Sequence, residues 1–121
     1  MTDTNAISDY LGGRVSLKAL DFMDGVMDST PAISVINRIE LLGHNRTEIP
    51  QFILAVQGCQ TIELTEAIIL KTIAIRKSRS IKVPDAIIAA TAIIHDLTLI
   101  THNIRDFENI TNLTLLDLHQ L

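Results

Sequence analysis

The chain has 121 residues, of which 47% are hydrophobic and 20% charged, a globular balance that excludes disorder as its main state. Ten Lys and Arg against 14 Asp and Glu give a net charge of −4, so nucleic-acid binding would require a local basic patch. With no Trp, one Tyr and three Phe, base stacking is excluded as the main mode of such binding.

Helical periodicity alternates with short β-branched runs along the whole chain, which predicts one α/β domain over residues 1–121. We expect helices at Ala6 to Leu11, Ser16 to Met27, Val35 to Leu42, Pro50 to Gln57, Glu66 to Ser78 and Pro84 to His95. Strands are expected at Ala32 to Ser34, Thr61 to Leu64, Leu97 to Thr101 and Leu113 to Leu116. This alternation favours a mostly parallel sheet with helices on its faces. The predicted helix Pro84 to His95 is apolar on almost every side, so we expect it to pack deeply against the sheet.

No feature of the sequence indicates export or a membrane. The segment Met1 to Asn5 has no signal-peptide character, and the most apolar stretch, Ala86 to Ile94, is too short to cross a bilayer. The single cysteine, Cys59, cannot form an internal disulfide. We therefore expect a cytoplasmic protein without membrane contact.

Polar residues that follow predicted strands are candidates for a site, because ligands of parallel sheets bind beyond the carboxyl ends of the strands. Asp3 precedes the first helix, Glu40 lies one turn beyond Ile36, and Asp85 lies in the first turn of its helix. Each also has a structural explanation. Asp3 would cap a helix, Glu40 would form an ion pair although Asn37 and His44 offer no strong partner, and Asp85 would suit the helix dipole.

Asn103 and Asp106 follow the predicted strand Leu97 to Thr101 and would form a capping pair if they had no other role. Capping does not predict that all these residues converge on one edge of a sheet. Two carboxylates about 5 Å apart repel by roughly 3 kcal/mol at an effective dielectric near 20, so such a cluster needs a cation or shared protons. Oxygen ligands without Cys or metal-spaced His favour Mg²⁺ or Mn²⁺, whose waters attack phosphate esters.

A basic segment leads into Asp85. Between Ala67 and Pro84 there is no acidic residue, and five of the ten Lys and Arg lie there: Lys71, Arg76, Lys77, Arg79 and Lys82. The segment would be a solvated helix end, or it would neutralise phosphates beside a metal site. We predict RNA binding by Arg76, Lys77, Arg79 and Lys82.

Four motifs together resemble the PIN domain of VapC-like toxins over essentially the whole chain. They are Asp3-Thr4-Asn5, then Ile33-Ser34-Val35 running into Glu40-Leu41-Leu42-Gly43, then Pro84-Asp85-Ala86-Ile87-Ile88-Ala89-Ala90-Thr91-Ala92, and finally Leu99-Ile100-Thr101-His102-Asn103 with Asp106-Phe107. The resemblance implies a three-layer α/β/α fold with a central, mostly parallel sheet. It also implies a divalent-metal-dependent ribonuclease, a cognate antitoxin that silences it, and a homodimer.

The resemblance also assigns residues to the site. It implies Asp3, Glu40 and Asp85 as catalytic metal ligands, Asn103 at the fourth catalytic position, where the family often has Asp, and Asp106 as a further ligand through water. Asn5, Ser34 and Thr101 would support them. The chain departs from the family in having Asn103 and in having only Met1 and Thr2 before Asp3, where a longer apolar strand is usual.

Three other classes of protein are alternatives to this interpretation. A PIN scaffold that binds RNA or a protein without cutting is compatible with both departures. A signalling receiver domain has the same length and an acidic pocket, but its paired acids, lone phosphoacceptor Asp and late Lys are missing. A dinucleotide-binding enzyme would need a glycine-rich phosphate loop, and Gly12-Gly13 is only a helix stop.

Overall fold

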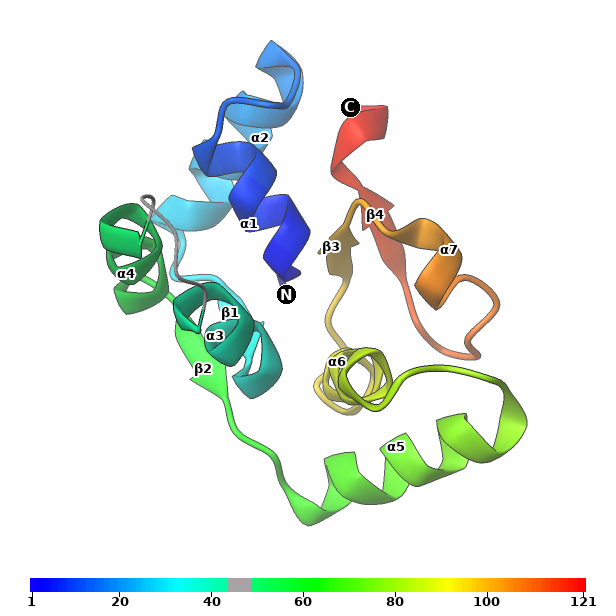
Figure 1. Ribbon diagram of the computed structural model, residues 1–121. Helices are drawn as coiled ribbons and strands as arrows, with labels where there is room; N and C mark the ends of the chain where they lie inside the picture. The colour runs from blue at the N-terminus through cyan, green and yellow to red at the C-terminus, as the bar shows by residue number, and fades with distance from the viewer. Residues whose placement is uncertain (44–48) are drawn as a thin grey trace.

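The computed structural model describes residues 1–43 and 49–121, so His44 lies outside the described residues (Figure 1). The elements in chain order are α1 (Thr4–Leu11), α2 (Leu17–Asp28), β1 (Ala32–Ser34), α3 (Val35–Leu42), α4 (Ile49–Gln57), β2 (Gln60–Ile62), α5 (Glu66–Ser78), α6 (Val83–Ile94), β3 (Leu99–Thr101), α7 (Ile104–Phe107), β4 (Leu115–Asp117) and a final 3-10 turn, Leu118–Gln120.

The strands form two parallel pairs, β1 with β2 and β3 with β4. The first three residues join these pairs. The Thr2 amide donates to Ala32 O at 3.1 Å, the Ile100 amide donates to Met1 O at 2.8 Å, and the Asp3 amide donates to Ile100 O at 2.8 Å. Residues 1–3 therefore complete a central sheet between β1 and β3, where Figure 1 places the N-terminus.

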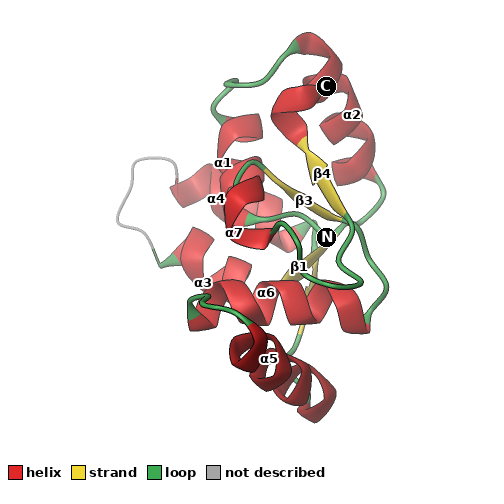
Figure 2. Cartoon of the chain, turned by 90° about the vertical axis from the view of Figure 1, so that its right-hand side faces the viewer, coloured by secondary structure: helices red, strands yellow, loops and turns green. Residues whose placement is uncertain are grey.

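Helices cover both faces of this sheet, as predicted. Leu99 packs into a cluster with residues of α5 and α6, whereas its neighbour Ile100 packs into a cluster with residues of α1 and α2. Successive strand residues point to opposite faces, so these two clusters are the two sides of one sheet. Figure 2 shows α5 and α6 on one side of β3 and β4, with α1 and α2 on the other. A third cluster joins α1 and β1 to α3 and α4.

Most predicted boundaries agree with the structure to within two residues, and α3, α5 and β1 agree fully. The predicted strand Leu97 to Thr101 was too long, because Leu97 still belongs to the end of α6. Its amide donates to Ala92 O at 2.8 Å and the Asp96 amide to Ile93 O at 3.1 Å, with Asp96 at φ 52°. This is a Schellman end, which uses the Leu97 amide before β3 begins.

The predicted deep packing of α6 holds for its middle. Ala86, Ile88, Ala89, Ala90, Thr91 and Ala92 are all buried. Its ends differ from the prediction, because Val83 is 45% exposed and Ile94 is 41% exposed. Among the described residues, no helix has the length and apolar character needed to span a membrane.

Candidate active site

Asp3 lies where the central strand ends and α1 begins. Its amide completes the sheet bond to Ile100 O, and its carboxylate Oδ1 accepts a hydrogen bond from the Thr4 amide at 2.8 Å. The capping interpretation of Asp3 is therefore correct. It does not exclude a second role, because the same position brings the carboxylate to the end of the sheet.

Asp3 is only 5% exposed, and two further donors hold its carboxylate. Asn37 Nδ2 donates to Oδ1 at 3.0 Å and Thr101 Oγ1 donates to Oδ2 at 2.8 Å. Burial nevertheless raises the pKa of Asp3, and the charge of Glu40 raises it further, against the lowering effect of these hydrogen bonds. The protein alone thus makes ionisation of Asp3 less favourable than that of a free aspartate.

Asn37, which sequence reasoning missed as a site residue, is fully buried between Asp3 and Ser34. Its Oδ1 accepts from the Ser34 amide at 3.1 Å and from Ser34 Oγ at 2.9 Å, while Ser34 Oγ accepts from the Asn37 amide at 3.0 Å. This capping box at the start of α3 orients the amide toward Asp3. Ser34 and Asn37 have the spacing of a capping box, and this feature of the sequence could have identified Asn37. Ser34 is therefore linked to the Asp3 carboxylate through Asn37.

Glu40 is half-buried and is linked to Asp3 through Thr4, a second residue that the sequence analysis missed. Thr4 Oγ1 donates to Glu40 Oε1 at 2.8 Å and accepts from Asn37 Nδ2 at 3.1 Å. The ion pair considered for Glu40 is absent among the described residues, because none of their Lys, Arg or His side chains pairs with it.

Asp85 is half-buried in the first turn of α6, as the dipole interpretation requires. Burial raises its pKa, and the charges of Asp106 and Asp3 raise it further, while Lys82 lowers it. The charge of Glu40 raises the pKa of Asp3, and the charge of Asp3 raises the pKa of Asp85. Asp3 is therefore close enough to both Glu40 and Asp85 for their charges to interact.

A pocket of about 300 Å³ brings the predicted residues together, and we call it the acid pocket. Its lining residues are Asp3, Thr4, Asn5, Ser8, Asp9, Glu40, Leu41, Phe52, Asp85 and Asn103. All four residues predicted to be catalytic are among them. Asp106 is not, because it lies in the neighbouring pocket that also contains Asp85.

The turn after β3 is held against α1. Asn5 Oδ1 accepts from the His102 amide at 3.0 Å, and Thr101 Oγ1 accepts from the Asn103 amide at 3.0 Å. Asn103 is the N-cap of α7, but its side chain makes no capping bond, so the predicted capping pair with Asp106 does not form. The exposed Asn103 side chain remains available to the acid pocket.

The chemistry of the acid pocket fits a hard divalent cation. Its chemistry-bearing groups are carboxylate, amide and hydroxyl oxygens, and two of its carboxyls have raised pKa values. Among residues 1–43 and 49–121, no three His, Cys, Asp or Glu side chains lie close enough together to bind one ion directly. The set therefore suits an ion such as Mg²⁺, which keeps several of its waters and meets some ligands through them.

A comparison with known protein families shows which family this chain belongs to. The sequence model of the PIN domain matches residues 1–113. The chain belongs to the PIN domain family. The predicted α/β PIN fold and the resemblance to VapC-like toxins are thereby confirmed.

Several solved structures similar to this PIN domain are toxin–antitoxin complexes. A chain of a toxin–antitoxin complex from Klebsiella pneumoniae is 26% identical in sequence, and the match covers 99% of this chain and 98% of that chain with a TM-score of 0.75. VapBC-1 from nontypeable Haemophilus influenzae is 28% identical, covers 98% and 96%, and has a TM-score of 0.74. VapBC2 from Rickettsia felis, bound to a promoter DNA fragment, shares the fold at 23% identity, 96% coverage of both chains and a TM-score of 0.77. No curated protein matches the chain.

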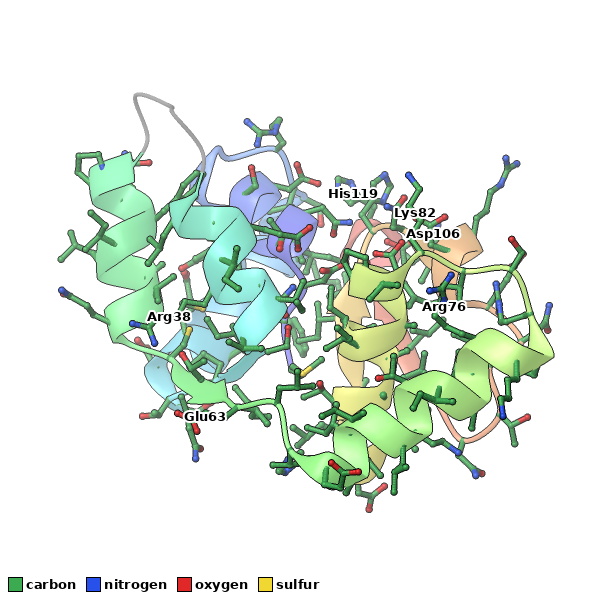
Figure 3. The ribbon with its side chains drawn as sticks, turned by 60° about the horizontal axis from the view of Figure 1, so that its bottom comes forward. Arg38, Glu63, Arg76, Lys82, Asp106 and His119 are labelled. Carbon is green, nitrogen blue, oxygen red and sulfur yellow. The ribbon has the colours of Figure 1, made fainter. Side chains whose placement is uncertain are left out.

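A second pocket of this PIN domain, about 530 Å³, adjoins the acid pocket at Asp85, and we call it the basic pocket. Its charged lining residues are Arg76, Arg79, Lys82, Arg105, Asp85 and Asp106. Three of the four residues predicted to bind RNA therefore line one cavity, and Figure 3 shows Arg76, Lys82 and Asp106 gathered beside α6. Lys77 is exposed on α5 and does not line this pocket.

Proposed function

We propose that this PIN domain is a divalent-metal-dependent endoribonuclease that acts as the toxin of a toxin–antitoxin pair. The observation that carries the proposal is the convergence of Asp3, Glu40, Asp85 and Asn103, from four separate segments, on one pocket. Raised pKa values at Asp3 and Asp85 support it, because buried repelling carboxylates are typical of sites completed by a cation.

In this proposal Asp3, Glu40 and Asp85 would hold Mg²⁺ or Mn²⁺, directly or through water, and Asp106 would act through water. When bound, such an ion acidifies a water and neutralises charge that develops on the phosphate. Asp3 is positioned for this role by three hydrogen bonds, from Thr4, Asn37 and Thr101, which leave part of its Oδ2 unoccupied. Asn103 would bind as a neutral ligand or orient a water.

The chain's own acids would move the proton. A water oxygen forms a bond to phosphorus, its proton passes to Glu40 or Asp85, and the bond from phosphorus to the leaving ribose oxygen breaks as that oxygen takes up a proton. Both acids line the acid pocket, so both are candidates for the base. Arg76, Lys77, Arg79 and Lys82 would position the RNA backbone.

Partners and location follow from the same proposal. The similar solved structures are toxin–antitoxin complexes, which supports an antitoxin as partner. Apolar side chains on α2 and α4 offer contact area for it or for the second copy in a homodimer, since Leu17 is 85% exposed and Leu54 is 71% exposed. We place the protein in the cytoplasm, as its single cysteine suggests.

The test is Mn²⁺-dependent cleavage of single-stranded RNA by the chain freed from antitoxin. Asp3→Ala, Glu40→Ala and Asp85→Ala are expected to abolish cleavage while far-UV circular dichroism stays native. Asp21→Ala is the matched control, because Asp21 is an exposed carboxylate of α2 outside the acid pocket. Undiminished cleavage in all three variants would refute the assignment.

A non-cutting scaffold that binds RNA or a protein is the second candidate, and Asn103 favours it because an amide replaces a negative charge at the pocket. It predicts weak Mn²⁺ binding and no cleavage by the wild-type chain even without antitoxin. Under the nuclease proposal, calorimetry detects Mn²⁺ binding to the wild-type chain, and Asn103→Asp strengthens it.

A further inference from the structure

We infer that the basic pocket is a subsite for one non-reacting phosphate of the RNA strand, held by Arg76, Lys82 and Arg105. This inference rests on the proposed function, since it places a neighbouring phosphate in the acid pocket. Arg105 did not belong to the basic segment recognised in the sequence, because it lies on α7 and reaches the pocket only through the fold.

The first support is the charge of the cavity. Four cationic side chains and two carboxylates line it, although the whole chain has a net charge of −4. Among the described residues, no carboxylate forms an ion pair with Arg76, Lys82 or Arg105. These cations form no ion pair with a described carboxylate and outnumber the two carboxylates of the cavity, an arrangement that favours an anionic ligand.

The second support is that Arg79 is already engaged. Its Nη1 donates to Glu108 O at 2.5 Å and its Nη2 to Asp106 O at 3.5 Å. The side chain thus ties the segment before α6 to the end of α7. We assign Arg79 as a positioning residue that holds α7, and with it Arg105, at the same cavity as Arg76, and not as a ligand of the phosphate.

The third support is the start of α6, which lies at the same cavity. Its N-cap, Lys82, makes no side-chain capping bond, so the first turn keeps backbone N–H donors without a side-chain acceptor. A helix N-terminus attracts anions through its dipole. In this pocket the attraction of the α6 N-terminus for an anion adds to that of the three cationic side chains.

The position of the pocket identifies the ligand. Asp85 lines both cavities, so a strand with its reacting phosphate in the acid pocket passes directly over Asp85 into the basic pocket. A guanidinium fork matches two phosphate oxygens, and two of the three proposed ligands are arginines. Without Trp in the chain, and with no aromatic side chain lining this pocket, the contact is to the backbone and independent of base sequence.

The test compares two double variants that remove the same charge. Arg76→Ala/Arg105→Ala empties the pocket, whereas Arg38→Ala/Lys71→Ala removes an exposed arginine of α3 and a half-exposed lysine of α5 that do not line it. We expect the pocket variant to raise KM for single-stranded RNA at least tenfold with kcat changed less than about threefold, since it loses binding common to substrate and transition state. The control variant is expected to stay within about threefold of wild type in both constants.

Salt dependence gives a second readout. Loss of one phosphate contact should lower the slope of log affinity against log salt by about 0.7 in the pocket variant. A neutral methylphosphonate placed at successive linkages should weaken RNA binding most at one position near the cut when the basic pocket is intact. When Arg76→Ala/Arg105→Ala is added, a methylphosphonate at that position should no longer weaken binding. Equal losses in both double variants, or an unchanged methylphosphonate profile, would overturn the subsite.

Binding measurements separate this inference from the proposed nuclease activity. The methylphosphonate profile is measured by fluorescence anisotropy on Glu40→Gln, which alters only the acid pocket. If wild type never cuts RNA but the profile disappears with Arg76 and Arg105, the subsite stands and the nuclease proposal fails. If the pocket variant loses antitoxin binding and keeps its full affinity for RNA, the pocket takes an acidic peptide and the inference is wrong.

Discussion

Asn37→Ala is expected to destabilise the protein strongly, although Asn37 contacts no ligand in the proposed mechanism. The side chain is fully buried and takes part in four hydrogen bonds, to Asp3, to Thr4 and twice from Ser34. A bond to an ionised carboxylate contributes about 2 kcal/mol and a neutral bond about 1 kcal/mol, so the four sum to about 5 kcal/mol. Water entering the space recovers part of this, and we expect a loss of about 4 kcal/mol.

The same variant should change the titration of Asp3. The hydrogen bond from Asn37 lowers the pKa of Asp3 and so opposes the raising effect of burial. Its loss should raise that pKa further, which carbon-13 NMR of the carboxyl group measures, while urea unfolding at pH 7 measures the stability.

Arg38→Ala is the control for this prediction, because Arg38 is the next residue on α3 and is exposed. It should change the free energy of unfolding by no more than about 0.5 kcal/mol. A loss below about 1 kcal/mol in Asn37→Ala, or an unchanged Asp3 titration, would show that the network does not hold the site as described.

Three further predictions concern stability. The folded protein raises the pKa of Asp3 above its value in the unfolded chain. The stability linked to this shift is fully present below the unfolded-state pKa and is lost as pH rises through the folded-state pKa. At pH 7 with EDTA, Asp3→Asn should therefore unfold in urea no more easily than wild type. Burial pushes the pKa of Asp9 up, but hydrogen bonds from His119 and Arg14 outweigh it and hold that pKa below 3.8. The stability advantage of wild type over Asp9→Asn should accordingly be complete above pH 3.8 and shrink on further acidification, and a difference independent of pH would count against it. Ile88→Ala should cost about 3 kcal/mol in thermal unfolding because Ile88 is 1% exposed, whereas Ile94→Ala, at 41% exposed on the same helix, should cost below about 1 kcal/mol.

Elements with clear end signals were predictable from the sequence. α3 begins after Ser34, whose side chain accepts from the Asn37 amide, and α5 begins after Thr65, whose side chain accepts from the Ile68 amide. Such capping depends on neighbouring residues only, so both helices were predicted with their correct bounds. The carboxylates could also be located, because residues at strand ends and first helical turns meet at one edge of a parallel sheet.

Features that depend on distant partners were not predictable. Residues 1–3 are too few to show a strand period, and only their bonds to Ala32 and Ile100 make them the centre of the sheet. Asn37 and Thr4 read as ordinary capping residues until Asp3 and Glu40 are placed beside them. Leu20 is half-buried, whereas Leu17 on the same helix is 85% exposed. The side of a short helix that meets the core depends on its tertiary neighbours.

The division of charge between the two pockets explains how an acidic chain would bind an acidic polymer. The net charge of −4 opposes RNA at long range, and the acid pocket on its own would repel the phosphate that it is proposed to cleave. The basic pocket begins at Asp85 and contains Arg76, Lys82 and Arg105, with which no described carboxylate forms an ion pair. Lys82 acts on both sides of this boundary, since it lines the basic pocket and lowers the pKa of Asp85. Attraction for the strand is thereby concentrated next to the proposed reaction centre, which favours a phosphate backbone laid across Asp85 over one bound elsewhere on the surface.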